Sequence, residues 1–176
     1  MELLDVCSLE TWTALENEIY RRSELNPAVY NTRGIRIQRN HRWPNRLCPE
    51  IKATAKGQSF ICATAHMNLA IMARESREPV IEECDAGMVK LVVPIFVDDI
   101  FLGAVGGCGK ILGDGEVDTF LVNKITEIEE DRVEQLAEDV PSITVQKAQE
   151  LAAFIEERIG QIVAAFAARR KAGGGS

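Results

Sequence analysis

Cysteine and histidine side chains are the most reactive groups of this sequence, and their spacing indicates where they could meet. Cys62 and His66 stand four residues apart in a helical stretch, so they project from one face of a single helix. Cys48 lies in the preceding helical segment, and Cys84 stands in a turn before an apolar strand. Together these four side chains would offer zinc the tetrahedral set of soft and borderline ligands that it prefers.

A second grouping of the same side chains suits another cofactor. Cys48, Cys62 and Cys84 together with Cys108 would offer four thiolates, the usual ligands of an iron–sulfur cluster. Neither grouping has the short C-x-x-C spacing that is typical of metal sites. For every cysteine, and for Cys7 above all, the alternative is a small buried apolar side chain. Zinc, an iron–sulfur cluster and no cofactor therefore stay open.

Other polar motifs near these cysteines carry less chemistry. Asp85 follows Cys84 in the turn, where its carboxylate could accept a hydrogen bond from a ligand hydroxyl. The glycines at 106, 107 and 109 continue a strand and precede no helix with a Lys-Ser or Lys-Thr pair, which argues against a phosphate loop. Close approach of a ligand or of a neighbouring backbone explains them better. No nucleophile, base and orienting group stand together, so we expect no enzyme activity.

Composition narrows the classes further. The 20 Lys and Arg residues against 27 Asp and Glu residues give a net charge of -7, which disfavours direct binding to nucleic acid. The first residues do not form a signal peptide, and no apolar run reaches the ~18 residues of a membrane span. Five cysteines, an odd number, indicate free thiols or ligands. We therefore expect a cytoplasmic chain with no membrane partner.

Apolar periodicity and turn residues predict the elements that would position these groups. Ser8 caps a first helix that runs to about Arg22, and two further helices are expected over 48–57 and 59–76, the second capped by Ser59. A basic loop over 39–46 is a candidate rim of a site. The predicted strands cover 29–37, 80–83, 89–97 and 101–111, with a hairpin turn at Asp98-Asp99.

The C-terminal third is charged and helical. A helix over 117–140 that breaks midway and ends at Pro141 is followed by a long helix whose apolar residues alternate in steps of three and four. This spacing predicts the seam of a coiled-coil homodimer, and the alternative is that the helix packs back on its own domain. The seam consists of Val145, Ala148, Ala152, Ile155, Ile159, Ile162 and Phe166.

Several short motifs resemble the PocR-type sensory domain, which is similar to PAS and GAF sensors. They are the spaced Cys48 and Cys62, the turn C-D-A-G-M at 84–88, the strand V-P-I at 93–95 and the strand L-G-A-V-G-G at 102–107. The resemblance covers about residues 1–115. It implies a domain that binds a small hydrocarbon derivative such as a short diol and signals to a regulator or enzyme. Asp85 stands where the family pattern has histidine, which puts the ligand preference in doubt.

These observations combine into one expected architecture. We predict an α/β (α+β) fold with a mostly antiparallel, PAS/GAF-like sheet and helices on one side, in three parts: a sensory domain at 1–115, a helical signalling extension at 116–171 and a linker or engineered tail at 172–176. The ligand pocket would lie between strands 89–111 and helix 59–76. Its ligand-binding residues would be Phe60, Met67, Asp85, Met88 and Phe96.

The expected function is that of a cytoplasmic sensor. Ligand binding, or a change at the cysteines, would shift the turn around Cys84 and bias the C-terminal helix between two arrangements. The alternatives are a redox or gas sensor with an iron–sulfur cluster or zinc at Cys48, Cys62, His66, Cys84 and Cys108, and a purely structural dimerisation module.

Overall fold

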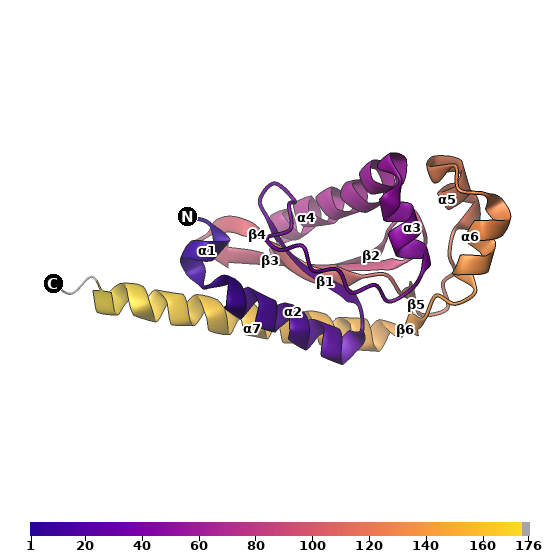
Figure 1. Ribbon diagram of the computed structural model, residues 1–176. Helices are drawn as coiled ribbons and strands as arrows, with labels where there is room; N and C mark the ends of the chain where they lie inside the picture. Colours follow the sequence, from indigo (N-terminus) through magenta and orange to yellow (C-terminus); the bar gives the residue numbers. More distant parts are fainter. Residues whose placement is uncertain (174–176) are drawn as a thin grey trace.

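The computed structural model describes residues 1–173, and residues 174–176 of the predicted tail lie outside that range. A four-stranded sheet forms the middle layer, and helices lie above and below it (Figure 1). Along the chain the elements are α1 Leu3–Val6, α2 Leu9–Ser23, β1 Asn26–Asn31, α3 Leu47–Ala53, the π-helix η1 Gly57–Ala63, α4 Thr64–Ser76, β2 Val80–Glu83, β3 Val89–Val97, β4 Ile100–Cys108, β5 Ile111–Leu112, α5 Thr119–Thr126, α6 Glu130–Ala137, β6 Ser142–Ile143 and α7 Val145–Gly173.

The sheet is antiparallel, with strand order β1-β4-β3-β2. Helix α4 lies on one face, whereas α2 and α7 lie side by side along the other (Figure 1). This arrangement confirms the predicted α+β fold and its mostly antiparallel sheet. The expectation of helices on one side only is wrong, because the strands bury apolar side chains on both faces and each face needs a covering layer.

The hairpin of β3 and β4 is the central unit of the sheet, and it confirms the prediction made from two apolar runs that flank a turn. Asp98 and Asp99 form its two-residue turn with φ angles of 48° and 63°. Two positive φ angles match the twist of the flanking strands in tight hairpins. Aspartate tolerates this conformation better than a branched apolar residue does.

Strand β1 differs from its prediction at both ends. It starts three residues earlier than expected, with Pro27 inside it, because β1 is an edge strand and one of its sides needs no donor. It ends at Asn31, whose side chain accepts hydrogen bonds from the backbone of Arg33 and Ile35. Gly34 then takes a φ of +71°, so the chain turns away from the sheet.

The helices confirm two predictions and correct a third. Ser8 caps α2 as expected, since its hydroxyl accepts a hydrogen bond from the Thr11 amide. Ser59, in contrast, caps nothing, because η1 begins at Gly57 and runs directly into α4. The helical segment predicted over 117–140 breaks midway as expected into two short helices, α5 and α6, because Glu127 takes a left-handed conformation between them.

Helix α7 packs along its own domain. Its buried residues form a stripe that meets α2 and β3 and includes Leu151, which a strict heptad seam would leave out. This broader stripe is typical of a helix laid on a globular core. The seam residue Val145 is exposed, and Phe166 is partly buried. The alternative of intramolecular packing therefore describes this chain, and the coiled-coil homodimer stays a prediction.

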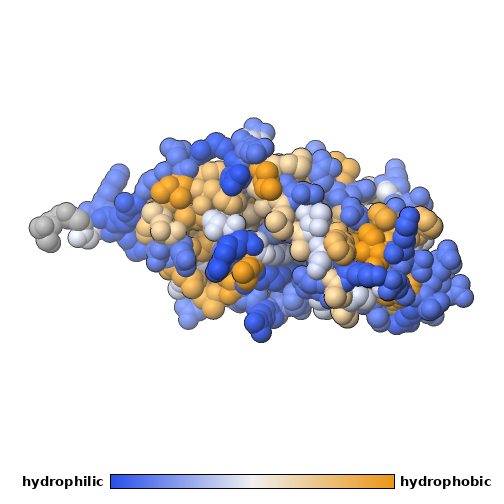
Figure 2. All heavy atoms as spheres, turned by 90° about the horizontal axis from the view of Figure 1, so that it is seen from above, coloured by the Kyte–Doolittle hydropathy of each residue, from blue (hydrophilic) through white to orange (hydrophobic). Residues whose placement is uncertain are grey.

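The opposite surface carries exposed apolar side chains among charged ones. Figure 2 looks down on the face that α4 covers, where orange atoms stand between blue ones. Phe60, Met67, Ile71 and Met72 of η1 and α4 are all exposed. None of the helices formed by residues 1–173 combines the length and the apolar character that a membrane crossing requires.

Candidate functional site

A cavity of about 580 Å³ lies between the sheet and a cover formed by α3, η1, the start of α4 and the loop after β1. Its volume falls within the ~300–1,000 Å³ that is typical of small-molecule sites. The loop over 39–46, predicted as a candidate rim, forms part of its wall through Arg39, His41 and Trp43. A second hollow, of only about 10 Å³, adjoins it on the surface of the sheet.

Strand register explains which side chains form the floor. Asn26 on β1, Cys108 on β4 and Lys90 on β3 are direct neighbours across the sheet, so their side chains share one face. Alternate residues further along these strands share that face too. The residues in the middle of the face, Ala28, Ala104 and Gly106, are small. They leave room on the sheet for two rings.

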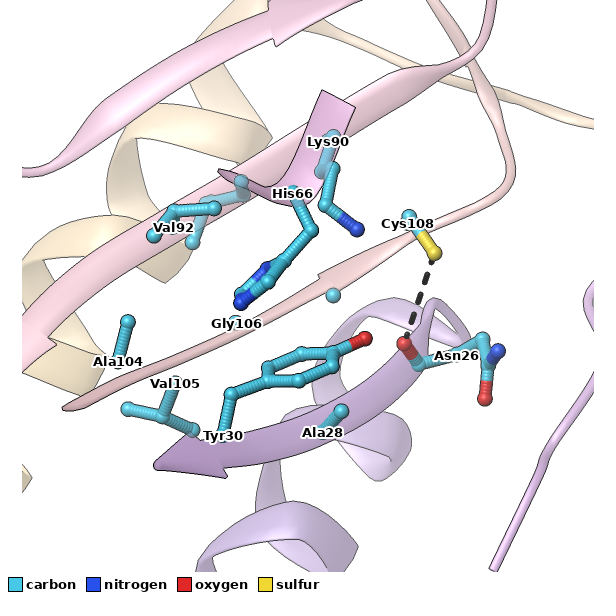
Figure 3. Close-up of a pocket in the computed structure, with 12 residues that line it drawn as sticks. Asn26, Ala28, Tyr30, His66, Lys90, Val92, Ala104, Val105, Gly106 and Cys108 are labelled. Carbon is cyan, nitrogen blue, oxygen red and sulfur yellow. Dashed lines mark hydrogen bonds between the residues drawn. The ribbon is translucent and has the colours of Figure 1, made fainter. Parts of the chain in front are cut away.

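Those two rings belong to Tyr30 and His66. They stack with centroids 3.7 Å apart and planes at 28°. Figure 3 shows the His66 ring above Tyr30, while the Tyr30 hydroxyl, the Lys90 ammonium and the Cys108 thiol point toward the same space. Burial, followed by the charges of Lys90, Arg36 and Lys52, lowers the pKa of His66 to about 3. His66 is therefore neutral at physiological pH.

Positive charge dominates the wall of the cavity. Arg36, Arg39, Lys52 and Lys90 line it, and the described residues place no aspartate or glutamate there. Burial and the charges of Arg36 and Lys52 lower the pKa of His41 to about 4. Burial disfavours the charged form of Lys90, but the neighbouring ionisable groups, Tyr30 first, outweigh it and raise the pKa. Lys90 is thus a cation at neutral pH.

The predicted metal ligands all line this one cavity: Cys48 from α3, Cys62 from η1, His66 from α4, Cys84 from the turn after β2 and Cys108 from β4. Among residues 1–173, however, no three His, Cys, Asp or Glu side chains lie in an arrangement that could hold one metal ion. The Cys48 thiol instead lies 3.6 Å from the Met88 sulfur. The structure therefore brings the predicted residues to one place without forming the predicted zinc or cluster site.

Three thiols of this group, those of Cys48, Cys62 and Cys84, are protected from ionisation. Burial is the largest cause that raises the pKa values of Cys48 and Cys84, and it raises that of Cys62 to about 11. Asn45 holds Cys48 in place: its side-chain oxygen accepts a hydrogen bond of 2.7 Å from the Cys48 amide, and its nitrogen donates one of 3.3 Å to the thiol. These cysteines are neutral thiols at pH 7.

A labelling experiment follows from these pKa values. Only the thiolate reacts with iodoacetamide, and a thiol with a pKa of about 11 is ionised in about one molecule in a thousand at pH 8. We expect Cys62 in the folded protein to be alkylated about 100-fold more slowly than in the protein unfolded in urea, with the rate still rising above pH 9. Peptide mass spectrometry measures both rates. A folded rate within about threefold of the unfolded rate at pH 8 would contradict the assignment.

The predicted ligand-binding residues are mostly placed elsewhere. Met88 lines the cavity, but Phe60 and Met67 are 59% and 56% exposed on the outer side of η1 and α4. The π-helix is the physical reason, because its i to i+5 hydrogen bonding shifts which residues face inward relative to an α-helix. Ile61 and Cys62 face the cavity instead.

Asp85 and Phe96 also lie outside the cavity. Asp85 is exposed and borders a separate hollow beside Glu116 and Phe120, where the turn points away from the sheet. Phe96 packs edge-on against Phe101, with ring centroids 5.5 Å apart, near the hairpin end of the sheet. The cavity lies instead toward the other end of β3, at Lys90.

Sequence reasoning did not assign Arg36, Lys52, Lys90 or Tyr30 to the site. Lys90 could have been identified from the sequence, because it is the single charged residue in an otherwise apolar strand. Arg36 and Lys52 had no such signal, because the first lies within the strand predicted over 29–37 and the second lies on a short helix. Their meeting depends on how the loop after β1 and helix α3 fold over the sheet.

Comparison with known proteins decides the family. Residues 5–165 match the family described as a sensory domain found in PocR. The chain belongs to the PocR sensory-domain family. This match confirms the resemblance seen in the sequence motifs, and it extends over α7 up to residue 165. No curated protein and no solved structure matches the chain significantly.

Two short motifs of this PocR domain lie beside the cavity. The C-D-A-G-M segment forms the turn between β2 and β3, where the Gly87 amide donates to the Cys84 carbonyl at 2.8 Å. The L-G-A-V-G-G segment forms the middle of β4, where the strand crosses the centre of the sheet. Both motifs therefore shape the floor and edge of the cavity.

Proposed function

We propose that this sensory domain binds a small organic molecule in the cavity above β1, β4 and β3. The cavity itself carries the proposal, because it has the volume of a small-molecule site and is lined by both apolar and polar side chains. Hydroxylated hydrocarbons such as a short diol are one class of ligand to test. The Tyr30 hydroxyl, which Figure 3 shows beside the cavity floor, would hydrogen bond to such a ligand.

Strand β3 offers a route for the signal. Lys90 and Val92 face the cavity side of the sheet, whereas Leu91 and Val93 belong to the core that contains Ile155 of α7. A ligand that shifts β3 therefore changes the surface on which α7 packs. We propose that α7 then biases a downstream output domain between two arrangements.

Ligand-dependent stabilisation tests this function. A compound that binds only the folded domain raises the Tm by an amount that grows with its concentration. We expect a compound from a panel of short diols, alcohols and organic acids to do so for the wild type, and to protect amides of α7 from hydrogen exchange. A63F, which places a ring in the cavity wall, should lose the response, whereas A55F at a nearby exposed position should keep it. An equal response in both variants would contradict the proposal.

One observation favours a second candidate function. Four cysteines from three elements and one turn line the same cavity, which is the grouping that a redox sensor would need. Metal and acid-labile sulfide analysis of protein purified without oxygen tests it. Iron and sulfide near stoichiometry would favour a cluster-based sensor, and zinc alone would indicate a structural site. Absence of both would leave the organic-ligand sensor.

A further inference from the structure

The four cations that line the cavity form no salt bridge within residues 1–173, whereas other charged groups of this protein do. Seven ion pairs connect side chains within residues 1–173, and none of them involves Arg36, Arg39, Lys52 or Lys90. All four line one cavity, although the protein as a whole carries a net charge of -7. An acidic protein has many carboxylates with which to neutralise these groups, yet none is placed on the wall formed by the described residues.

Burial makes this arrangement costly without a ligand. Lys90 is only 7% exposed, and its ammonium makes no hydrogen bond or ion pair to residues 1–173, with the Tyr30 ring 5.6 Å away as its aromatic neighbour. A buried charge normally needs a partner. Arg36 is partly satisfied, since its Nη1 donates to the Asn40 carbonyl at 3.1 Å.

Unsatisfied polar atoms gather at the same place. Four buried side-chain nitrogens or oxygens lack a hydrogen-bond partner among the described residues, and three of them belong to residues that line this cavity: Arg36 Nε, His41 Nδ1 and His66 Nδ1. Most buried polar groups in proteins have a hydrogen-bond partner. Such a cluster is therefore consistent with a ligand that supplies the missing partners.

We propose that the ligand of this domain carries an anionic oxygen group, a carboxylate or a phosphate, which Lys90 and Arg36 bind. The inference rests on the proposed function and narrows its ligand class. The guanidinium of Arg36 offers the planar fork that matches either group, and Lys90 supplies a point charge from the floor. The rings of Tyr30, His66 and Trp43 give the rest of the ligand a planar or apolar surface. A neutral diol would leave the four cations without a counter-charge on the cavity wall formed by the described residues.

Two fluorescent dyes that differ in one sulfonate test the proposal. 8-Anilinonaphthalene-1-sulfonate carries an anionic oxygen group, and N-phenyl-1-naphthylamine has the same rings without it. We expect the folded wild type to bind the sulfonate with a Kd at least about tenfold lower, because charged hydrogen bonds are the stronger ones. Displacement of the bound dye by benzoate or by phenyl phosphate then distinguishes a carboxylate site from a phosphate site.

Variants locate the binding. K90M and R36Q should each raise the Kd for the sulfonate about tenfold or more and leave that for the neutral dye nearly unchanged. K110M is the matched control, because Lys110 is 8% exposed, pairs with Glu24 at 3.1 Å and lies outside the cavity. It should leave both Kd values unchanged.

The outcomes separate the two proposals. Equal binding of both dyes, unaffected by K90M and R36Q but lost in A63F, would overturn the anionic ligand and leave the organic-ligand sensor in place. Binding of neither dye to the folded wild type would count against both. If K90M does not fold, R36Q decides the question alone, with its circular dichroism spectrum and Tm as the check on folding.

Discussion

Replacing Gly106 by alanine is expected to lower the free energy of unfolding by about 3 kcal/mol or more. Gly106 lies in β4, where it pairs with Ala28 on one side and Val92 on the other. A Cβ atom at this position would lie 1.8 Å from the Leu91 carbonyl oxygen. That oxygen belongs to the backbone of the central hairpin, so the strands would have to separate to make room.

The control for this variant is Gly160→Ala in α7. A Cβ atom there meets nothing within 4 Å, and Gly160 is exposed in the middle of a helix. Alanine should therefore raise the free energy of unfolding by about 0.5–1 kcal/mol. Urea denaturation followed by circular dichroism measures both changes. A Gly106→Ala variant within about 1 kcal/mol of the wild type would show that the sheet adapts to a side chain, and would contradict the expectation.

Gly106 also connects the stability of the sheet to the site. It lies on the face that carries Lys90 and Cys108, at the level where Tyr30 and His66 stack. The sequence left two explanations for the glycines, a close ligand or a close backbone. At Gly106 the neighbouring backbone is the one observed, since the contact is to Leu91 of the adjacent strand. The absence of a side chain at Gly106 also leaves the space above the sheet open.

Local patterns predicted much of the fold. The hairpin of β3 and β4 could be predicted because two apolar runs flank Asp98 and Asp99, whose turn depends on neighbours in the sequence alone. Helix α2 could be predicted for the same reason, from its stripe of apolar residues and the Ser8 cap. The π-helix η1 was not, because its hydrogen bonding departs from the α-helical period on which such reasoning relies.

The site was predicted only in part, for a physical reason. Cys48, Cys62, Cys84 and Cys108 do line one cavity, as their places on helices and turns implied. The thiols of Cys48, Cys62 and Cys84 are neutral, and within residues 1–173 the cysteines do not form the metal group that residue types alone suggested. The electrostatic character of the cavity depends on Arg36 and Lys52, which reach it through tertiary folding of a loop and a short helix. No local pattern encodes such an approach.

The packing of α7 gives the last prediction. Ile155→Ala is expected to lower the free energy of unfolding by about 2–5 kcal/mol, because the side chain is 0% exposed among residues of the sheet and α2. Val145 belongs to the same heptad pattern but is 49% exposed at the start of the helix. Val145→Ala should therefore change the free energy of unfolding by no more than about 0.5 kcal/mol.

This pair of variants distinguishes the two arrangements of the heptad residues. If α7 is stabilised by its own domain, Ile155→Ala alone is costly and the Tm of the wild type does not depend on protein concentration. In a dimer held by the coiled-coil seam, both side chains would be buried between helices, both variants would be costly, and the Tm would rise with concentration. Thermal unfolding over a 100-fold range of concentration, combined with sedimentation velocity, measures each quantity. Intramolecular packing also couples α7 to β3, so a domain in which Ile155→Ala is costly and Val145→Ala is not has the contact through which a ligand at Lys90 could act on the helix.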